Sequence, residues 1–164
     1  MDNTTIRGNI STISYNSTGW SSFKISFLQT LLATHCIQVC AVQEHMLLKR
    51  NINRISNAFP DYDTFILPAI KSNGNISSGR PSSGLVLIFR KTLSKYVTHI
   101  NCPDSSRVHA IKVSMTNETF VFINVYLPTD PRTHNFDDTL LLKSLQDIQY
   151  RIRPFFVWFN DISL

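Results

Sequence analysis

Four polar residues of this chain end or directly follow stretches that are predicted to be β-strands: Asn16, Glu44, Tyr126 and Asn160. Sheet proteins commonly place their sites at the carboxyl ends of strands. Glu44 follows a short apolar run that is rich in β-branched residues, which predicts a buried strand. A carboxylate beside an amide oxygen suits Mg²⁺, which would polarise a phosphoryl oxygen and steady a leaving group. These residues therefore predict metal-assisted chemistry on a phosphate.

Each of these residues, taken alone, also has an ordinary structural explanation. Glu44 fits a solvated loop position after a strand. Asn16 opens the sequence Asn-Ser-Thr-Gly, which is good turn chemistry. Tyr126 fits a strand aromatic whose hydroxyl reaches the rim of the sheet. Both kinds of explanation stay open on the residues alone, and only their joint order favours a site.

Strand parity extends the set of candidates, because side chains two positions apart share a face. Asn124 shares a face with Tyr126, and Trp158 shares one with Asn160. Arg80 lies in a segment rich in Ser, Gly and Asn, where it is a candidate contact for a phosphate backbone. Four histidines show no zinc spacing and are predicted to be surface or loop residues: His45, His99, His109 and His134.

The elements that must position these residues follow from periodicity. Strands are predicted over 10–16, 37–43, 62–67, 84–89, 96–100, 107–115, 119–127 and 155–159, and the segment 71–83 is predicted to be a loop. The strand over 119–127 is apolar on both faces and is therefore predicted to be central. A first helix begins at Ser21 or Ser22, with an apolar face of Phe23, Phe27, Leu28, Leu31 and Leu32. Further helices are predicted over 47–59 and 135–152. This order predicts a layered α/β fold in one domain.

Composition restricts the class of protein. The chain has 164 residues, 43% of them hydrophobic, and a net charge of +5 with a pI near 9.3. This charge is compatible with a DNA partner, but the basic residues are spread along the chain, so a mildly basic domain without such a partner fits equally well. No apolar run is long enough for a membrane span and no signal peptide is visible. Three cysteines, an odd number without metal spacing, disfavour a disulfide framework, and we expect an intracellular location, cytoplasmic or nuclear.

Three segments in order resemble one enzyme family: Val42-Gln43-Glu44-His45, Asn124-Val125-Tyr126-Leu127-Pro128-Thr129-Asp130 and Phe159-Asn160-Asp161. Together they resemble the endonuclease/exonuclease/phosphatase family, and most of all the endonuclease domain of non-LTR retrotransposon polyproteins. The resemblance runs from about Ile10 to Leu164. It implies an α/β (α+β) four-layer α-β-β-α sandwich of the deoxyribonuclease-I-like type. Residues 1–9 are then a polar leader, and residues 10–164 a partial domain that is incomplete at the C-terminus.

The resemblance also implies roles. Asn16 and Glu44 would bind or support Mg²⁺, Tyr126 would contact the scissile phosphate, and Asn160 would contact phosphate. Trp158 stands where the family motif Gly-Asp-Phe-Asn has the Asp that helps to activate water. An indole is a donor only and cannot replace that carboxylate. The family's C-terminal His motif has no counterpart in the chain.

Three hypotheses follow. The first is a Mg²⁺-dependent phosphodiesterase that nicks DNA, with impaired activity. The alternative is a catalytically inactive, truncated relic with at most weak nucleic-acid binding. A phosphatase or deadenylase relative is a third option, which the wording of the three segments disfavours.

Overall fold

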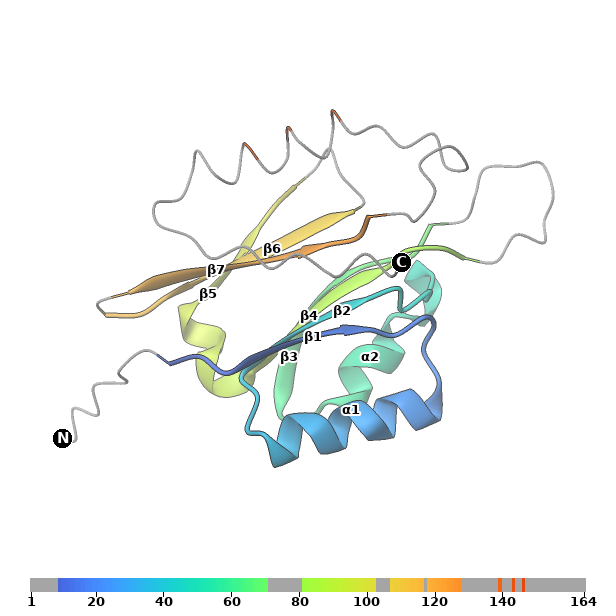
Figure 1. Ribbon diagram of the computed structural model, residues 1–164, viewed down its shortest axis with the longest axis horizontal. Coiled ribbons are helices and arrows are strands. Elements are labelled where there is room, and N and C mark those ends of the chain that lie inside the picture. Colours follow the sequence, from blue (N-terminus) through green and yellow to red (C-terminus); the bar gives the residue numbers. More distant parts are fainter. Residues whose placement is uncertain are drawn as a thin grey trace.

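The chain folds into two β-sheets that pack face to face, with helices against the outer face of the first sheet (Figure 1). The computed structural model describes residues 9–70, 81–102, 107–116 and 118–127, together with Thr139, Lys143 and Gln146. The strands are β1 (Thr12–Asn16), β2 (Val39–Gln43), β3 (Tyr62–Leu67), β4 (Leu85–Arg90), β5 (Val97–Ile100), β6 (Val108–Ser114) and β7 (Thr119–Val125). The α-helices are α1 (Ser22–Thr34) and α2 (Asn53–Ala58), and the 3₁₀ turns are η1 (Lys49–Asn51) and η2 (Lys91–Tyr96).

The first sheet has the strand order β1-β2-β4-β3. β1 and β2 are parallel, with Asn16 beside Gln43, whereas β4 runs antiparallel to both β2 and β3. All five residues of β2 are buried, as its continuous apolar pattern predicts for a strand covered on both faces. The strands predicted at 10–16, 37–43, 62–67 and 84–89 are thus confirmed, with small shifts at their ends.

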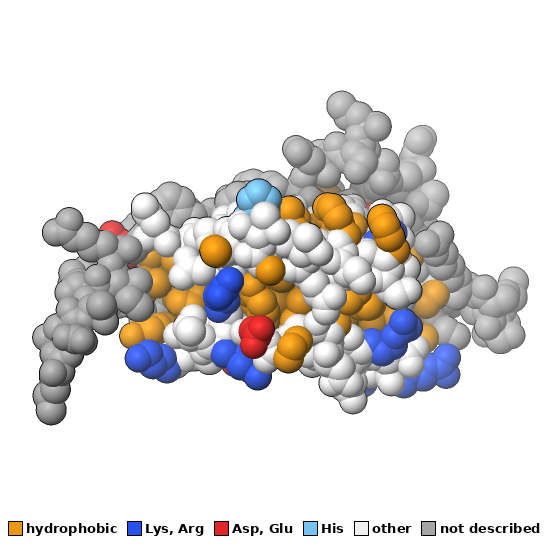
Figure 2. Space-filling model, turned by 90° about the horizontal axis from the view of Figure 1, so that it is seen from below, with side chains coloured by type: hydrophobic (Ala, Val, Ile, Leu, Met, Phe, Trp, Pro, Cys, Tyr) orange, Lys and Arg blue, Asp and Glu red, His pale blue; other side chains and the backbone are white. Residues whose placement is uncertain are grey.

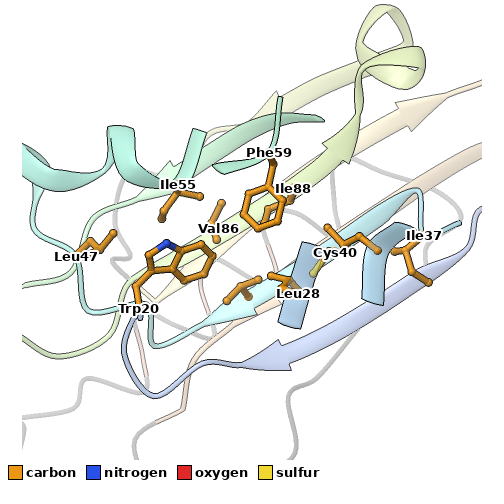
Figure 3. Close-up of a cluster of buried hydrophobic side chains, with 11 residues drawn as sticks. Trp20, Leu28, Ile37, Cys40, Leu47, Ile55, Phe59, Val86 and Ile88 are labelled. Atoms are coloured by element: carbon orange, nitrogen blue, oxygen red, sulfur yellow. The ribbon is translucent and has the colours of Figure 1, made fainter. Parts of the chain in front are cut away.

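Helix α1 begins where the sequence predicts it, because the Ser21 hydroxyl accepts a hydrogen bond from the Lys24 N–H over 3.3 Å. Leu28 and Leu32 are buried against the first sheet. The predicted apolar face is too wide, however, since Phe23 is 80% exposed and Phe27 is 46% exposed. The core under the helices is a single cluster, shown in Figure 3, of Trp20, Leu28, Leu32, Ile37, Cys40, Val42, Leu47, Ile55, Phe59, Val86 and Ile88.

The helix predicted over 47–59 is wrong in its first half. Only Asn53–Ala58 is α-helical, preceded by the short turn η1. Met46 has a φ of 56° and Leu48 is extended, so the chain cannot enter a helix at Leu47. The helical spacing of Leu48, Ile52, Ile55 and Phe59 therefore does not correspond to one continuous helix. The segment is irregular up to Ile52 and α-helical over Asn53–Ala58.

The second sheet has the order β5-β6-β7, and both pairs of strands are antiparallel. Its inner face packs on the first sheet through a cluster of Val39, Ala41, Leu87, Phe89, Leu93, Ile111, Val113 and Phe122. The sequence predicted the strand over 119–127 to be central, but β6 holds the middle position among the described strands. β7 is apolar on both faces because its outer side chains belong to another buried cluster, of Val108, Ala110, Val121, Ile123 and Val125.

Several predictions lie outside the described residues: the leader, most of the loop over 71–83 with Arg80, and the last strand with Trp158 and Asn160. Of the helix predicted over 135–152, only Thr139, Lys143 and Gln146 are described; each is helical and exposed, as expected for its polar face. Among the described helices, none is long and apolar enough to cross a membrane.

Two of the described cysteines differ in burial. Cys40 is buried, which raises the pKa of its thiol to about 12, whereas Cys36 is exposed.

Figure 2 shows the helical face, on which lysine and arginine side chains occur at several separate places and not in one patch. The positive charge on this face is therefore scattered, as the sequence indicates.

Candidate functional site

The carboxyl ends of β1, β2 and β7 meet at one end of the sandwich. All three strands run from left to right in Figure 1 and finish at its right-hand end. Parallel pairing puts Asn16 beside Gln43, so Glu44 is the next residue beyond the sheet. The side chain of Asn124, near the end of β7, reaches the backbone of β2 and β4 at the same end. Three of the four predicted strand-end residues are therefore neighbours at one edge, while Asn160 lies outside the described residues.

Asn16 and Glu44 are in direct contact. The Nδ2 amide of Asn16 donates a hydrogen bond to Oε1 of Glu44 over 2.9 Å. The Oδ1 of Asn16 accepts from the backbone N–H of Thr18 over 3.1 Å, which closes an Asx turn. The turn explanation of Asn16 is thus confirmed, and the same amide orients the Glu44 carboxylate, while its support of a metal stays a prediction.

The backbone around Glu44 is held from the β1 side. The N–H and the hydroxyl of buried Ser17 both donate to the Gln43 carbonyl, each over 2.9 Å, and the N–H of Gly19 donates to the Glu44 carbonyl over 2.6 Å. Glu44 itself has a φ of 55°, a conformation that costs a non-glycine residue free energy and is seen where surrounding structure enforces it. The carboxylate is therefore presented from a fixed and strained loop, which differs from an ordinary solvated loop position.

His45 anchors this loop through its imidazole ring. It was predicted to be a surface residue, and this prediction is wrong. Its ring is fully buried, with Nε2 bonded to the Leu67 carbonyl over 3.1 Å and Nδ1 accepting from the Leu47 N–H over 3.0 Å. This pattern requires the tautomer with a proton on Nε2. Burial lowers the pKa of His45 to about 4, while backbone hydrogen bonds to Leu67 and Leu85 oppose that shift. A neutral imidazole thus provides an acceptor for the Leu47 N–H and a donor for the Leu67 carbonyl.

Asn124 joins the two sheets directly behind Glu44. Its Nδ2 donates to the carbonyls of Val42 and Val86, each over 3.0 Å, and its Oδ1 accepts from Nε2 of Gln43 over 2.6 Å. Nε2 of Gln43 also donates to the Ser14 hydroxyl over 3.1 Å. Asn124 is 1% exposed. Its predicted contact with phosphate remains untested, and its geometry favours a structural role, because both ends of the amide already bind protein atoms.

Tyr126 lies just beyond β7, beside an arginine that sequence reasoning missed. The guanidinium carbon of Arg107 is 5.5 Å from the centre of the Tyr126 ring, and the Tyr126 N–H donates to the Arg107 carbonyl over 3.0 Å. Burial raises the pKa of Tyr126, the nearby Glu44 carboxylate raises it further, and Arg107 lowers it. Burial also lowers the pKa of Arg107. Tyr126 is thus within electrostatic reach of Glu44, and Arg107 adds positive charge to the same edge.

The signal that could have identified Arg107 is positional. It immediately precedes the first residue of β6, and the antiparallel register pairs Val108 with Val125, which puts Arg107 opposite Tyr126. The sequence places Arg107 at the start of a predicted strand, but it does not reveal which strand is the neighbour. Knowing the register of the β6–β7 hairpin would have been sufficient to identify Arg107 as a neighbour of Tyr126.

The described residues provide one carboxylate at this edge. Within the described ranges, no group of three or more His, Cys, Asp or Glu side chains forms a metal cluster. Mg²⁺ is commonly held by one or two carboxylates and otherwise by water and substrate phosphate. A single oriented carboxylate flanked by an amide therefore fits Mg²⁺, and does not fit a metal that requires several nitrogen or sulfur ligands.

Comparison with known proteins shows the fold. No protein-family model matches the chain, and no curated protein matches it in sequence. Solved structures do match. They include the 3′ phosphatase NExo from Neisseria bound to a product DNA hairpin, at 15% identity over 88% of this chain and 55% of that chain, with a TM-score of 0.57. An endonuclease/exonuclease/phosphatase family protein from Leptotrichia buccalis matches at 19% identity over 87% and 61%, with a TM-score of 0.54.

The endonuclease domain of TRAS1, a telomere-specific non-LTR retrotransposon, also matches, at 11% identity over 85% of this chain and 52% of that chain, with a TM-score of 0.52. The chain spans about half the length of the solved structures it matches. Its two-sheet α/β fold is therefore the deoxyribonuclease-I-like fold of endonuclease/exonuclease/phosphatase structures, over about half their length.

Proposed function

We propose that this chain is a phosphodiesterase-type domain whose site is the Glu44 edge of the sandwich, and that its substrate is DNA. The observation that carries the proposal is the hydrogen bond from Asn16 to Glu44 at the carboxyl ends of two parallel strands, with Tyr126 and Arg107 beside it. The similarity of the fold to structures described as a DNA-bound 3′ phosphatase and a retrotransposon endonuclease supports the same substrate class.

Each residue has a role that its geometry supports. Glu44 holds Mg²⁺, which when bound withdraws charge from a phosphoryl oxygen. Asn16 fixes the direction of the Glu44 carboxylate through its amide. Tyr126 donates its hydroxyl to a phosphate oxygen, and its raised pKa keeps that proton in place at neutral pH. Arg107 supplies positive charge for the phosphate backbone and restrains the Tyr126 ring.

Outside the described residues, the sequence supplies the rest of the proposal. Arg80 contacts the phosphate backbone and Asn160 contacts phosphate. Trp158 replaces the carboxylate that would activate the attacking water, so we propose that the rate is strongly reduced. A retrotransposon origin is proposed on the three sequence segments and on the TRAS1 likeness of the fold.

The test is nicking of supercoiled plasmid with Mg²⁺, with EDTA as the first control. Glu44→Gln removes the charge and keeps the shape, and we expect nicking to fall by about two orders of magnitude or more. Glu118→Gln is the matched control, because Glu118 is exposed in the β6–β7 hairpin at the other end of the sandwich. Nicking that survives EDTA or Glu44→Gln contradicts the proposal.

The second candidate function, an inactive fold with weak nucleic-acid binding, is favoured by Trp158. It is distinguished by Trp158→Asp. If the site is intact apart from this position, the variant nicks plasmid faster than the natural chain, and the gain disappears in the double variant with Glu44→Gln. If neither the natural chain nor Trp158→Asp nicks while both stay folded, the inactive alternative holds.

A further inference from the structure

Two histidines face each other in the space between the sheets. Nε2 of His109, on β6, lies 3.0 Å from Nε2 of His99, on β5, and their ring centres are 5.0 Å apart. His109 is 4% exposed, whereas His99 is exposed at the edge of the second sheet. Sequence reasoning placed both on the surface; His109 is buried because inward-facing positions of β6 form the inter-sheet core.

The surroundings decide which ring carries the shared proton. Nδ1 of His109 is buried and has no hydrogen-bond partner among the residues that the structure describes. A buried N–H without an acceptor is more costly than a bare nitrogen there, so Nδ1 of His109 carries no proton. His109 therefore carries its proton on Nε2 and donates it to Nε2 of His99. The remaining N–H of His99 is then on Nδ1, in a ring that is exposed to solvent.

The ring of His99 also contacts the first sheet. The His99 ring stacks on Phe65 of β3, with ring centres 4.9 Å apart, and Phe65 in turn contacts Phe89 of β4 at 5.4 Å. Across β7, His109 is paired with Asn124, the residue that bonds to β2 and β4. The histidine pair thus lies between an aromatic contact at the rim and the amide bridge in the core.

Among the described residues, no acidic side chain acts on either histidine. The inner faces of the two sheets carry uncharged side chains beside the pair, including Phe65 of β3 and Asn124 of β7. The titratable groups that act on His109 are His99 and His45, and both disfavour its cation. Among the flanking groups, Arg107 immediately precedes the same strand and is also a cation, while the Asp63 carboxylate of β3 accepts from the Ser94 hydroxyl.

We propose that the His99–His109 contact is an acid-sensitive latch that holds the His99 ring of β5 against Phe65 of the first sheet. With one N–H between the two Nε2 atoms the latch is closed. A proton added to His99 at Nε2 leaves two N–H groups facing each other, unless His109 moves its proton to the buried Nδ1, which has no acceptor. Both arrangements are unfavourable while the two rings stay in contact, so the protonated His99 ring turns out to solvent. This movement ends its stacking on Phe65 and frees strand β5.

The direction of the pH effect follows from the pKa shifts. Burial, then the neighbouring His99 and His45, lowers the pKa of His109 from 6.5 to about 3, and burial also lowers the pKa of His99. The unfolded chain therefore binds more protons than the folded chain below pH 6.5. The contribution of His109 to the free energy of unfolding is complete above pH 6.5. It is lost as the pH falls toward the pKa of His109 in the folded chain. For His109, acidification from pH 8 to pH 5 lowers the folded-to-unfolded ratio about 30-fold.

The experiment measures this ratio by urea unfolding at pH 8 and pH 5, in buffer with EDTA so that no metal bridges the rings. His109→Gln keeps a donor toward His99 but does not titrate. Between pH 8 and pH 5 we expect its folded-to-unfolded ratio to fall about 30-fold less than that of the natural chain. His35→Gln is the matched control, since His35 caps the exposed end of α1, and it should recover none of it. Full acid loss in a folded His109→Gln protein overturns the proposal.

A second measurement keeps the proposal testable if His109→Gln does not fold. Nitrogen NMR of the imidazoles in the natural chain should show a proton on Nε2 of His109 and no titration of that ring between pH 8 and pH 5. The protection factors of the β5 amides, which correct for the intrinsic effect of pH on exchange, should fall with acid before those of β2 do. A His109 ring that titrates near pH 6.5, or an equal loss of protection in both strands, contradicts the latch. Neither readout depends on nuclease activity, so this test is independent of the proposed function.

Discussion

Asn16 and Glu44 are 28 residues apart in the chain, yet the amide of one donates to the carboxylate of the other over 2.9 Å. The contact exists because β1 and β2 are parallel neighbours whose ends are in register, so that the residue ending β1 meets the residue following β2. Thr18 holds the other end of the Asn16 amide, and Glu44 is held at a φ of 55°. The geometry thus orients one carboxylate outward from the end of the sheet.

The first prediction concerns this pair and needs no catalysis. Asn16→Asp replaces the donor by a second carboxylate facing Glu44, and like charges at this distance repel. We expect the variant to be less stable than the natural chain in EDTA and to gain more stability from Mg²⁺, because the metal then binds two carboxylates in the folded state. Thermal unfolding with and without Mg²⁺ measures this. Asn16→Ala is the control, which should lose stability without the extra Mg²⁺ gain; equal Mg²⁺ gains in both variants would count against a metal site here.

The second prediction concerns the charge around Tyr126. Glu44 raises the pKa of the Tyr126 hydroxyl and Arg107 lowers it, both on top of the effect of burial. Glu44→Gln should therefore lower the pKa of Tyr126, and Arg107→Met should raise it. Carbon NMR of labelled tyrosine, with Tyr126→Phe to assign the signal, follows the titration of the individual ring. Shifts in the same direction for both variants would show that Tyr126 does not lie between these two charges.

The third prediction concerns the bridge between the sheets. Asn124→Asp has the same shape but presents a carboxylate oxygen to the carbonyls of Val42 and Val86, where the amide donated two hydrogen bonds. We expect a loss of about 2–4 kcal/mol in the free energy of unfolding, because buried carbonyls lose their donor and face a like partial charge. Urea unfolding at neutral pH measures the loss. Asn101→Asp, at an exposed position, should change stability by less than about 0.5 kcal/mol; similar losses in both would remove Asn124 from the inter-sheet bridge.

The fourth prediction concerns the close approach of Gly84 to His45. A Cβ on Gly84 would lie 2.7 Å from Cε1 of His45, and Gly84 has a φ of 95°. Gly84→Ala should therefore cost about 2 kcal/mol or more, through the contact as well as the backbone. Gly19→Ala, with a similar φ of 97°, measures the backbone part. If the contact with His45 matters, Gly84→Ala costs more than Gly19→Ala and is less harmful in a His45→Ala background; strict additivity would refute it.

The sequence by itself determined most of the elements of this protein. Period-two patterns and apolar runs located the seven described strands, and the pair Ser21 and Ser22 marked the start of α1. Those signals are local, because alternation and capping are set by neighbouring residues. The positions of Asn16, Glu44 and Tyr126 at strand ends followed from the same patterns. The three sequence segments indicated the fold family, and the likeness to solved structures agrees with them.

Only the tertiary structure decided what these side chains contact. Asn124 faces the first sheet and bonds to β2 and β4, and no pattern within its own strand shows that partner. His45 and His109 are buried, and Phe23 is exposed, because burial depends on which element packs above a residue. Arg107 joined the site only through the register of β6 with β7. A sequence pattern shows on which face of a strand a side chain lies. The residue that it contacts belongs to a strand far away in the sequence, and tertiary packing decides which residue that is.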